Sequence, residues 1–507
     1  MKKIIYILFF IPSILFSQVK KKDTLVKKIN PKVTYKKRVL ETTEIDLLSS
    51  FYTQEGSNAA VTGGIGTEQL DDFAGNITIS IPLNDDDVLS IDATISAYSS
   101  ASSSNLNPFY NPTSNRNQGD DDDDGDDDDD KPSRGKQVII SGASTPSSVT
   151  GTIKGTPWAA SSGASKEDVW ISGVIGYSHS SDSRNSIYKA HVSFANEFDY
   201  TSFGGGVGFA KLFNQKNTEI AIDANVYLDS WRPMYPTEIK TFKTYGGNLN
   251  TSFFSGVDIY NQQGIAINKN LLSAWRPIST SLVDNNARNS YSVSLSFSQI
   301  LSKNSQISIF ADYLMQQGWL ANPMQRVYFA DKPNFYIGEK QYINNYTTTR
   351  NQGVFQLADD IERLPKTRVK IPIGVRYHYY VNEKITLRTY YRYYFDDWGI
   401  NSQTINIELP IKLAEKYTMY PSFRYYTQTQ SDYFAPYEQH LSTSTFYTSD
   451  YDLSEYNSNQ YGVGFKYTDI FTSFFGLKNV NLNYHFYKRN TGLTAHIVSL
   501  GAKFVLE

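Results

Sequence analysis

The sequence predicts an all-β fold: a transmembrane antiparallel β-barrel of about 16 strands. Three observations lead to this prediction. Many segments alternate apolar and polar side chains with a period of two, and the connections between them are alternately short and long. The mean hydropathy is -0.42, yet the 507 residues include 38 Tyr and 29 Phe. A barrel explains this combination because one face of each strand meets lipid, the other meets water, and tyrosines suit the two interfaces.

The alternation is clearest at 291–298, where apolar residues at odd positions alternate with serines at even positions. It recurs at 77–83, 220–228, 369–379 and 405–413. With their flanks, these segments are long enough to cross a bilayer as tilted strands. The alternative is an extracellular β-sandwich, which fits less well because its strands are shorter.

The connections divide the predicted barrel into two different ends. Tight turns rich in Asn, Asp, Ser and Lys mark one end, and long extracellular loops mark the other. An even number of strands, from a first at 44–52 to a last at 493–507, returns both termini to the periplasmic side. The predicted turns are 84–87, 181–185, 214–216, 302–304, 382–384 and 414–416, and the long loops are 55–72, 101–166, 232–288, 318–367 and 429–457.

The N-terminal residues predict export from the cytoplasm. Lys2 and Lys3 precede the apolar run Ile4–Phe16, and Ser17 before Gln18 is a plausible cleavage point. The segment that follows is basic and is expected to be a disordered periplasmic tail, with docking to an anionic partner as the alternative. The chain has no cysteine, so no disulfide stabilises it. The predicted division is 1–17 signal peptide, 18–42 basic tail and 43–507 barrel.

Several strings of residues resemble a family of outer-membrane proteins of unassigned function that is common in Bacteroidota. They are AVTGGIGTE at 60–68, YSSASSSNLNP at 98–108, SGAS at 141–144, and QQG at 316–318 followed by QRVYF at 325–329. The resemblance covers nearly the whole mature chain. It implies an outer-membrane barrel and supplies no reaction. Relatives encoded beside flavin-transfer and thioredoxin-like genes keep an envelope redox role as one alternative.

The most unusual string is an acidic segment, 118–131, that contains ten aspartates around Gly125. Such a density of like charges is self-repelling unless cations neutralise it. Its start matches the first markers of a calcium loop, but Lys131 stands where a bidentate Glu belongs. Calcium is therefore the candidate cofactor, and a solvated acidic loop is the alternative. The candidate metal ligands are Asp120, Asp122, Asp124 and Asp128.

Once the strands are phased, the water-facing residues separate by charge along the chain. Early strands contribute acids and later strands contribute bases, so the two sets lie on opposite walls of a closed ring. This arrangement favours a wet pore, although the same charges could hold inward-folded loops in a plugged barrel. The acidic set is Glu44, Asp46, Asp92, Glu197, Asp223 and Asp229, with Lys189 as an exception. The basic set is Lys370, Arg376, His378, Arg388, Arg392, Lys412, Arg424 and Lys466, with Glu408 opposing.

A tripeptide, Trp-Arg-Pro, occurs twice. Arginine beside an indole can form a stacked platform for sugars or aromatic compounds, and more often such a cluster packs loops together. The binding candidates are Trp231, Arg232, Trp275 and Arg276. No enzyme activity is expected, because none of the six histidines lies in a nucleophile or metal motif.

The sequence therefore favours a pore or solute-conducting channel in the bacterial outer membrane. The alternatives are a plugged barrel that acts as a surface binding or scaffold protein with a calcium-binding loop, and an outer-membrane component of an envelope redox system. The expected partners are outer-membrane lipid, the barrel-assembly machinery and small solutes. No nucleic-acid partner is expected.

Overall fold

The computed structural model describes residues 38–100, 167–278, 286–345, 354–468 and 476–506. The predicted signal peptide, most of the basic tail and the whole aspartate-rich segment lie outside these ranges. Among the described residues, no helix is long and apolar enough to span a membrane.

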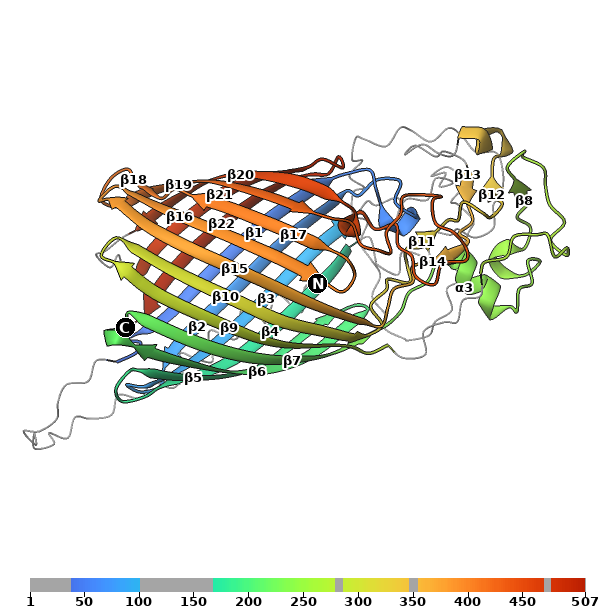
Figure 1. Cartoon of the computed structure of the whole chain (residues 1–507). Helices are drawn as coiled ribbons and strands as arrows, with labels where there is room; N and C mark the ends of the chain where they lie inside the picture. The colour runs from blue at the N-terminus through green and yellow to red at the C-terminus, as the bar shows by residue number, and fades with distance from the viewer. Residues whose placement is uncertain (1–37, 101–166, 279–285, 346–353, 469–475, 507) are drawn as a thin grey trace, which may run out of the picture. The chain divides into compact units, whose positions relative to one another are not determined.

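Nearly all regular structure belongs to one antiparallel sheet (Figure 1). Its strands, in chain order, are β1 (Thr43–Glu55), β2 (Leu70–Pro82), β3 (Asp87–Ser100), β4 (Glu167–Ser180), β5 (Ser186–Glu197), β6 (Tyr200–Phe213), β7 (Thr218–Trp231), β9 (Arg288–Ser302), β10 (Ser305–Gly318), β15 (Thr367–Asn382), β16 (Ile385–Asp396), β17 (Asn401–Glu408), β18 (Ile411–Lys412), β19 (Tyr417–Gln428), β20 (Tyr456–Thr468), β21 (Leu477–Arg489) and β22 (Thr494–Leu506).

The sheet closes into a barrel because β1 pairs with the last strand, β22, as well as with β2. The sheet has 17 strands, and β17 and β18 share one place between β16 and β19, which leaves sixteen positions. The predicted strand number is therefore confirmed, as are the tight turns at one end and the long loops at the other. We call these the turn end and the loop end.

The prediction of one unbroken strand at 405–413 is wrong. The ladder is interrupted at Leu409 and Pro410, between β17 and β18. Proline has no backbone N–H to donate, so it cannot continue a ladder between two neighbours. The two neighbouring strands each keep a backbone hydrogen bond to the interrupted segment. Leu409 N donates to Pro421 O at 3.0 Å, and Thr386 N donates to Pro410 O at 3.1 Å.

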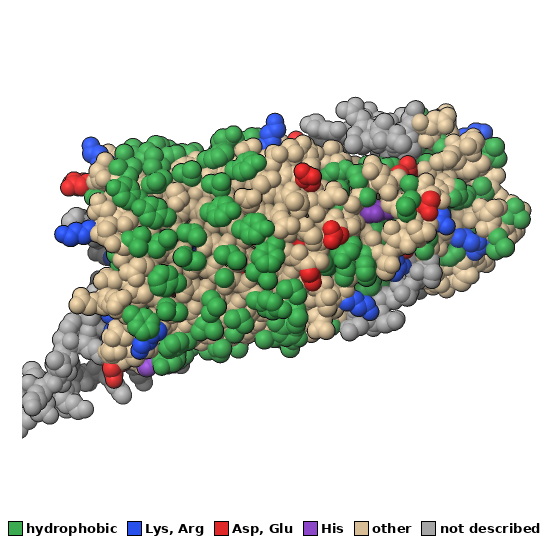
Figure 2. All heavy atoms as spheres, in the orientation of Figure 1, with side chains coloured by type: hydrophobic (Ala, Val, Ile, Leu, Met, Phe, Trp, Pro, Cys, Tyr) green, Lys and Arg blue, Asp and Glu red, His purple; other side chains and the backbone are tan. Residues whose placement is uncertain are grey.

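The outer face of the barrel is apolar. Large aliphatic side chains there are unusually exposed, for example Val207 at 63%, Ile175 at 54% and Leu295 at 52%. Burying such side chains is worth roughly 25 cal/mol per Å² of apolar surface, so an open face of this kind fits lipid rather than water. Figure 2 shows hydrophobic side chains spread over the strands, with charged side chains mostly toward the two ends.

At the loop end, the described parts of three connections build a folded cap with small elements of its own (Figure 1). These parts are 232–278 and 286–287, 319–345 and 354–366, and 429–455. Its fully buried core includes Ile239, Phe254, Trp275, Ile337 and Ile361. Long loops were predicted, but a cap with a hydrophobic core was not. The cap elements are α3 (Thr237–Thr244), β8 (Ile259–Asn261), β11 (Arg326–Val327), β12 (Phe335–Gly338), β13 (Val354–Gln356) and β14 (Asp360–Ile361), with the 3-10 turns η4 (Ser252–Phe254), η5 (Lys340–Asn345) and η6 (Tyr451–Leu453).

Arg326 joins the cap to the first loop, residues 56–69. Its guanidinium binds Glu238 through Nε to Oε1 at 2.7 Å, and the two side chains are 1% and 0% exposed. Its Nη1 donates to Val61 O at 3.0 Å, and its guanidinium carbon lies 5.1 Å from the centre of the Phe355 ring. Because arginine is always charged, this buried site requires both the carboxylate and the aromatic face.

A glycine of the first loop allows this loop to pack closely against the cap. Gly63 has φ 79°, a left-handed conformation, and packs so closely against the Tyr328 ring that a Cβ would clash with it. The strings at 60–68 and 325–329, which carry the family resemblance, therefore meet each other in the fold. Their role in the structure is to join the first loop to the cap.

The cap also buries carboxyl groups. Burial raises the pKa of Asp359 to about 7, that of Glu362 to about 8 and that of Asp450 to about 6. Each is hydrogen-bonded: Phe329 N donates to Asp359, Asn322 N to Glu362, and Gln325 Nε2 to Asp450. These acids favour the folded cap when they are protonated.

Glu238→Gln should loosen the cap while leaving the barrel intact. The change leaves the Arg326 charge buried without its counter-charge, which costs about 3 kcal/mol or more. We expect much faster protease cleavage within 232–287 and 319–366, with unchanged heat-modifiable gel mobility of the barrel. Asp258→Asn, an exposed change in the same loop, is the matched control and should leave cleavage at its original rate. Equal cleavage of both variants would contradict the role given to the ion pair.

The cap should open more readily as the pH rises. Because the folded pKa values of Asp359, Glu362 and Asp450 are raised, their stabilising contribution is complete below the unfolded values, near pH 4. It is lost progressively as the pH rises from there to the folded values, at about pH 6 to pH 8. Protease cleavage of the cap, normalised to cleavage of the unfolded chain at each pH, measures this change. Glu362→Gln should reduce the rise of the normalised cleavage rate with pH. A cleavage rate that falls as the pH rises would contradict the stabilising role given to the protonated acids.

Candidate functional site

The pairing register of the strands shows which side chains face the lumen of the barrel. Asp92 alternates with the outward residues Ile91 and Ala93, and Arg376 alternates with Val375 and Tyr377. The same alternation places every residue of the two predicted charge sets on the inward face: Glu44, Asp46, Asp92, Lys189, Glu197, Asp223, Asp229, Lys370, Arg376, His378, Arg388, Arg392, Glu408, Lys412, Arg424 and Lys466.

The register adds inward charges that the sequence analysis missed. On the acidic half, β1 to β10, they include Asp72, Glu219 and Asp312, and Arg288 is a further exception. On the basic half, β15 to β22, they are Arg368, Arg489 and Lys503, opposed by Asp396. The sequence does contain a signal for Lys503, because it alternates with the apolar residues Val498, Leu500, Ala502, Phe504 and Leu506 of the last strand.

Ion pairs neutralise parts of the basic half. Arg368 binds Asp396 at 2.5 Å near the loop end, and Arg388 binds Glu408 at 2.8 Å. At the seam between the two halves, Lys503 Nζ lies 2.6 Å from Glu44 and 3.4 Å from Asp46. The charge separation is therefore not complete, because each of these pairs joins an acid to a base on the lumen wall.

Three other arginines of the basic half do not form ion pairs of this kind with any part of the chain that the structure describes. Among the described residues, none of Arg376, Arg392 and Arg424 has a carboxylate within 4.0 Å. The guanidinium of Arg376 lies instead over Phe310 and Tyr390, 5.1 Å and 5.7 Å from the ring centres. These rings position Arg376 without removing its charge.

Phe310 lies flat against the barrel wall because the residue opposite it is glycine. Its direct partner on β15 is Gly374, and a Cβ there would overlap the ring. On the other half, Asp223 lies over Gly208 of β6 in the same way. Both inward side chains therefore lie along the wall instead of projecting across the lumen.

Neutral donors hold several carboxylates of the acidic half. Asn76 Nδ2 lies 3.1 Å from both carboxylate oxygens of Asp92, and Thr78 Oγ1 donates to the same group at 2.6 Å. Ser96 Oγ donates to Asp72 at 2.5 Å. These donors are neutral, so they satisfy the carboxylate oxygens without adding a positive charge to this half.

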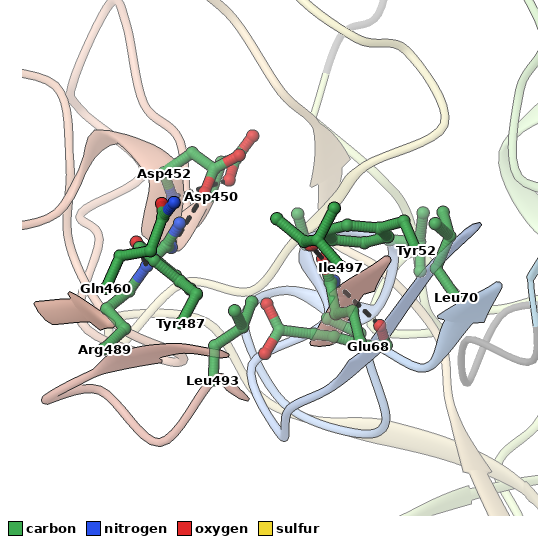
Figure 3. Close-up of a pocket in the computed structure, with 14 residues that line it drawn as sticks. Tyr52, Glu68, Leu70, Asp450, Asp452, Gln460, Tyr487, Arg489, Leu493 and Ile497 are labelled. Carbon is green, nitrogen blue, oxygen red and sulfur yellow. Dashed lines mark hydrogen bonds and ion pairs between the residues drawn. The ribbon is translucent and has the colours of Figure 1, made fainter. Parts of the chain in front are cut away.

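A cavity of about 550 Å³ lies at the loop end, between β1, β20, β21 and β22 and the loops above them (Figure 3). On one side Arg489 binds Asp452 at 2.8 Å, and its guanidinium lies 4.2 Å from the centre of the Tyr456 ring. Glu68 lies on the other side, and burial raises its pKa. Sequence analysis did not identify this cavity, because it is formed by residues far apart in the chain.

The two Trp-Arg-Pro tripeptides lie in different surroundings. Trp275 is 0% exposed in the cap core, where its Nε1 donates to Ala358 O at 3.0 Å, so its ring is not available to a ligand. The proposed binding role of Trp275 is therefore wrong, because packing of the cap buries the indole. Arg276 lies over Phe242 at 5.9 Å, Trp231 Nε1 donates to Asp199 at 3.2 Å, and Arg232 lies over Phe198 at 5.6 Å.

The described ranges contain no group of three or more His, Cys, Asp or Glu side chains that could hold a metal ion. The predicted calcium ligands Asp120, Asp122, Asp124 and Asp128 lie outside those ranges.

The chain is similar to several solved structures at low sequence identity. One is described as "Bacterial polysaccharide outer membrane secretin", with 7% identity, a TM-score of 0.40 and coverage of 91% of this chain and 98% of that one. OpdK of Pseudomonas aeruginosa with vanillate has 7% identity, a TM-score of 0.33 and coverage of 92% and 98%. A TodX mutant, described as a monoaromatic hydrocarbon channel, has 8% identity, a TM-score of 0.37 and coverage of 92% and 91%.

The sequence matches no curated protein. It does match a family model described as "Protein of unknown function (DUF3570)" over residues 32–497. The predicted membership in an uncharacterised family that spans nearly the whole chain is thereby confirmed. The chain belongs to the DUF3570 family.

Proposed function

We propose that the chain is a pore in the outer membrane of a bacterium of the Bacteroidota, with its long loops outside and both termini in the periplasm. It conducts small polar solutes and has no catalytic role. The observation that carries this proposal is the charge on the inward face, which is mainly acidic from β1 to β10 and mainly basic from β15 to β22.

Acidic and basic walls that face each other affect the solutes that pass through a pore. Opposite walls of opposite sign produce a field across the lumen, which orients polar solutes as they pass. An apolar plug would leave these charges without solvent, at a large cost in free energy. The flat packing of Phe310 and Asp223 over Gly374 and Gly208 also supports an open interior. The cap then restricts access at the loop end.

Neutralising single lumen charges should shift ion selectivity in opposite directions. Asp223→Asn removes a charge from the acidic half and should favour anions, and Lys466→Gln removes one from the basic half and should favour cations. The measurement is the reversal potential of refolded full-length protein in planar bilayers under a KCl gradient. Asp258→Asn in the cap is the control. Complete electrical silence, with folding shown by heat-modifiable gel mobility, would overturn the pore.

A second candidate function is a surface binding barrel, and the cap favours it. A cap with its own core and a buried Arg326–Glu238 pair is more elaborate than a simple constriction requires. In this alternative, calcium orders the segment 118–131 through Asp120, Asp122, Asp124 and Asp128.

The calcium alternative makes a separate prediction. A chelator should increase protease cleavage within 101–166 and leave cleavage of the cap unchanged, because carboxylates that share a cation hold the segment together. Replacing Asp120, Asp122 and Asp124 with Asn should give the same cleavage pattern with calcium present. If neither chelator nor substitution changes cleavage, the aspartates do not hold calcium.

A further inference from the structure

We propose that Arg392, Arg424 and Thr404, together with Arg376, form a binding site on the lumen wall for a small oxyanion, either a carboxylate or a phosphate group. The inference rests on the proposed pore and names the class of solute that the basic half selects. Three observations support it: the positions of these side chains, the absence of hydrogen-bond and carboxylate partners among the described residues, and an adjoining cavity.

The strand register brings the site together. Thr404 on β17 is directly opposite Arg392 on β16. Asn406, the next inward residue on β17, is directly opposite both Tyr390 and Arg424. Residues directly opposite each other have Cβ atoms about 5 Å apart, and diagonal neighbours are about 7–8 Å apart. Arginine side chains are long enough to reach one anion over Thr404 from both sides.

Two groups at this position lack hydrogen-bond partners among the described residues. Thr404 is 2% exposed and its Oγ1 has none, and the buried Nε of Arg392 has none either. Buried polar groups without partners are costly and uncommon in folded proteins. Arginine only donates, and the hydroxyl can donate as well, so the missing partner is an acceptor oxygen.

The charge of the surroundings selects an anion. Arg376, Arg392 and Arg424 have no carboxylate within 4.0 Å in the described ranges, whereas the neighbouring Arg388 is paired with Glu408. A water molecule could accept the same hydrogen bonds, but it would leave three positive charges uncompensated. A carboxylate or phosphate supplies both the acceptor oxygens and the opposite charge, and guanidinium groups bind either one in a bidentate manner.

There is also room for the rest of a small solute. A cavity of about 260 Å³ is lined by Arg376, Tyr390 and Asn406, together with the Arg388–Glu408 pair. Phe310 and Tyr390 hold the Arg376 guanidinium at its edge, which reduces the ordering cost when an anion binds.

Two anions test the site: acetate as the carboxylate and inorganic phosphate as the phosphate. Each is added to open single channels at constant KCl, and the concentration that halves the current is measured. Arg392→Gln and Thr404→Val should each raise this concentration about tenfold, because each removes a hydrogen bond to a charged group. Block by acetate alone identifies a carboxylate site, and block by phosphate alone identifies a phosphate site.

The matched control is Lys466→Gln, which removes one inward positive charge of the same half away from Thr404. It should leave the half-blocking concentration within about twofold, since only long-range charge changes. Thr404→Val leaves the net charge unchanged and should fold normally, because it removes a hydroxyl that has no partner. If Lys466→Gln raises the half-blocking concentration as much as Arg392→Gln does, the block depends only on the total charge of the lumen wall, and the proposed site is overturned.

Calorimetric titration of the folded full-length chain in detergent separates the two proposals. Open channels that neither anion blocks, together with no heat of binding, would overturn the site and leave the pore standing. Electrical silence together with acetate or phosphate binding that Arg392→Gln and Thr404→Val both weaken would support the site and overturn the pore.

Discussion

The backbone hydrogen bonds of the sheet constrain everything else in this molecule. A strand that faces lipid has no water to satisfy its N–H and C=O groups, so each strand needs a partner on both sides. Pairing of β1 with β22 meets this requirement and removes the open edges. Closure fixes one face of every strand toward lipid and the other toward the lumen. The charges of the lumen therefore follow from the same alternation that makes the outer face apolar.

The sequence was sufficient to predict the barrel and its inward charges, because both depend on local patterns along the chain. A period of two assigns a face to each residue, and short polar runs mark the turns, so the barrel, its strand number and the inward charges were all accessible. The break at Pro410 was missed because the alternation continues through it. Proline changes the hydrogen bonds of the ladder without changing which face its neighbours occupy.

The cap and the pairing of charges could not be predicted, because they depend on contacts between distant segments. Nothing local to Glu238 or Arg326 indicates that they meet, 88 residues apart, in a buried ion pair. Trp275 looked like an exposed platform because a loop position alone does not reveal a hydrophobic core. In the same way, the sequence placed Arg388 and Arg392 on one wall but could not show that only Arg388 has a carboxylate partner.

The contacts of Arg326 have a consequence for how the cap moves. Its guanidinium is shared by Glu238, Val61 and Phe355, which belong to three different loops of the chain. If one of these loops leaves, a buried charge of the Arg326–Glu238 pair loses part of its support, which makes the position of the remaining loops unfavourable as well. The loops are thus energetically coupled. We therefore expect these three loops to open together instead of fraying one at a time.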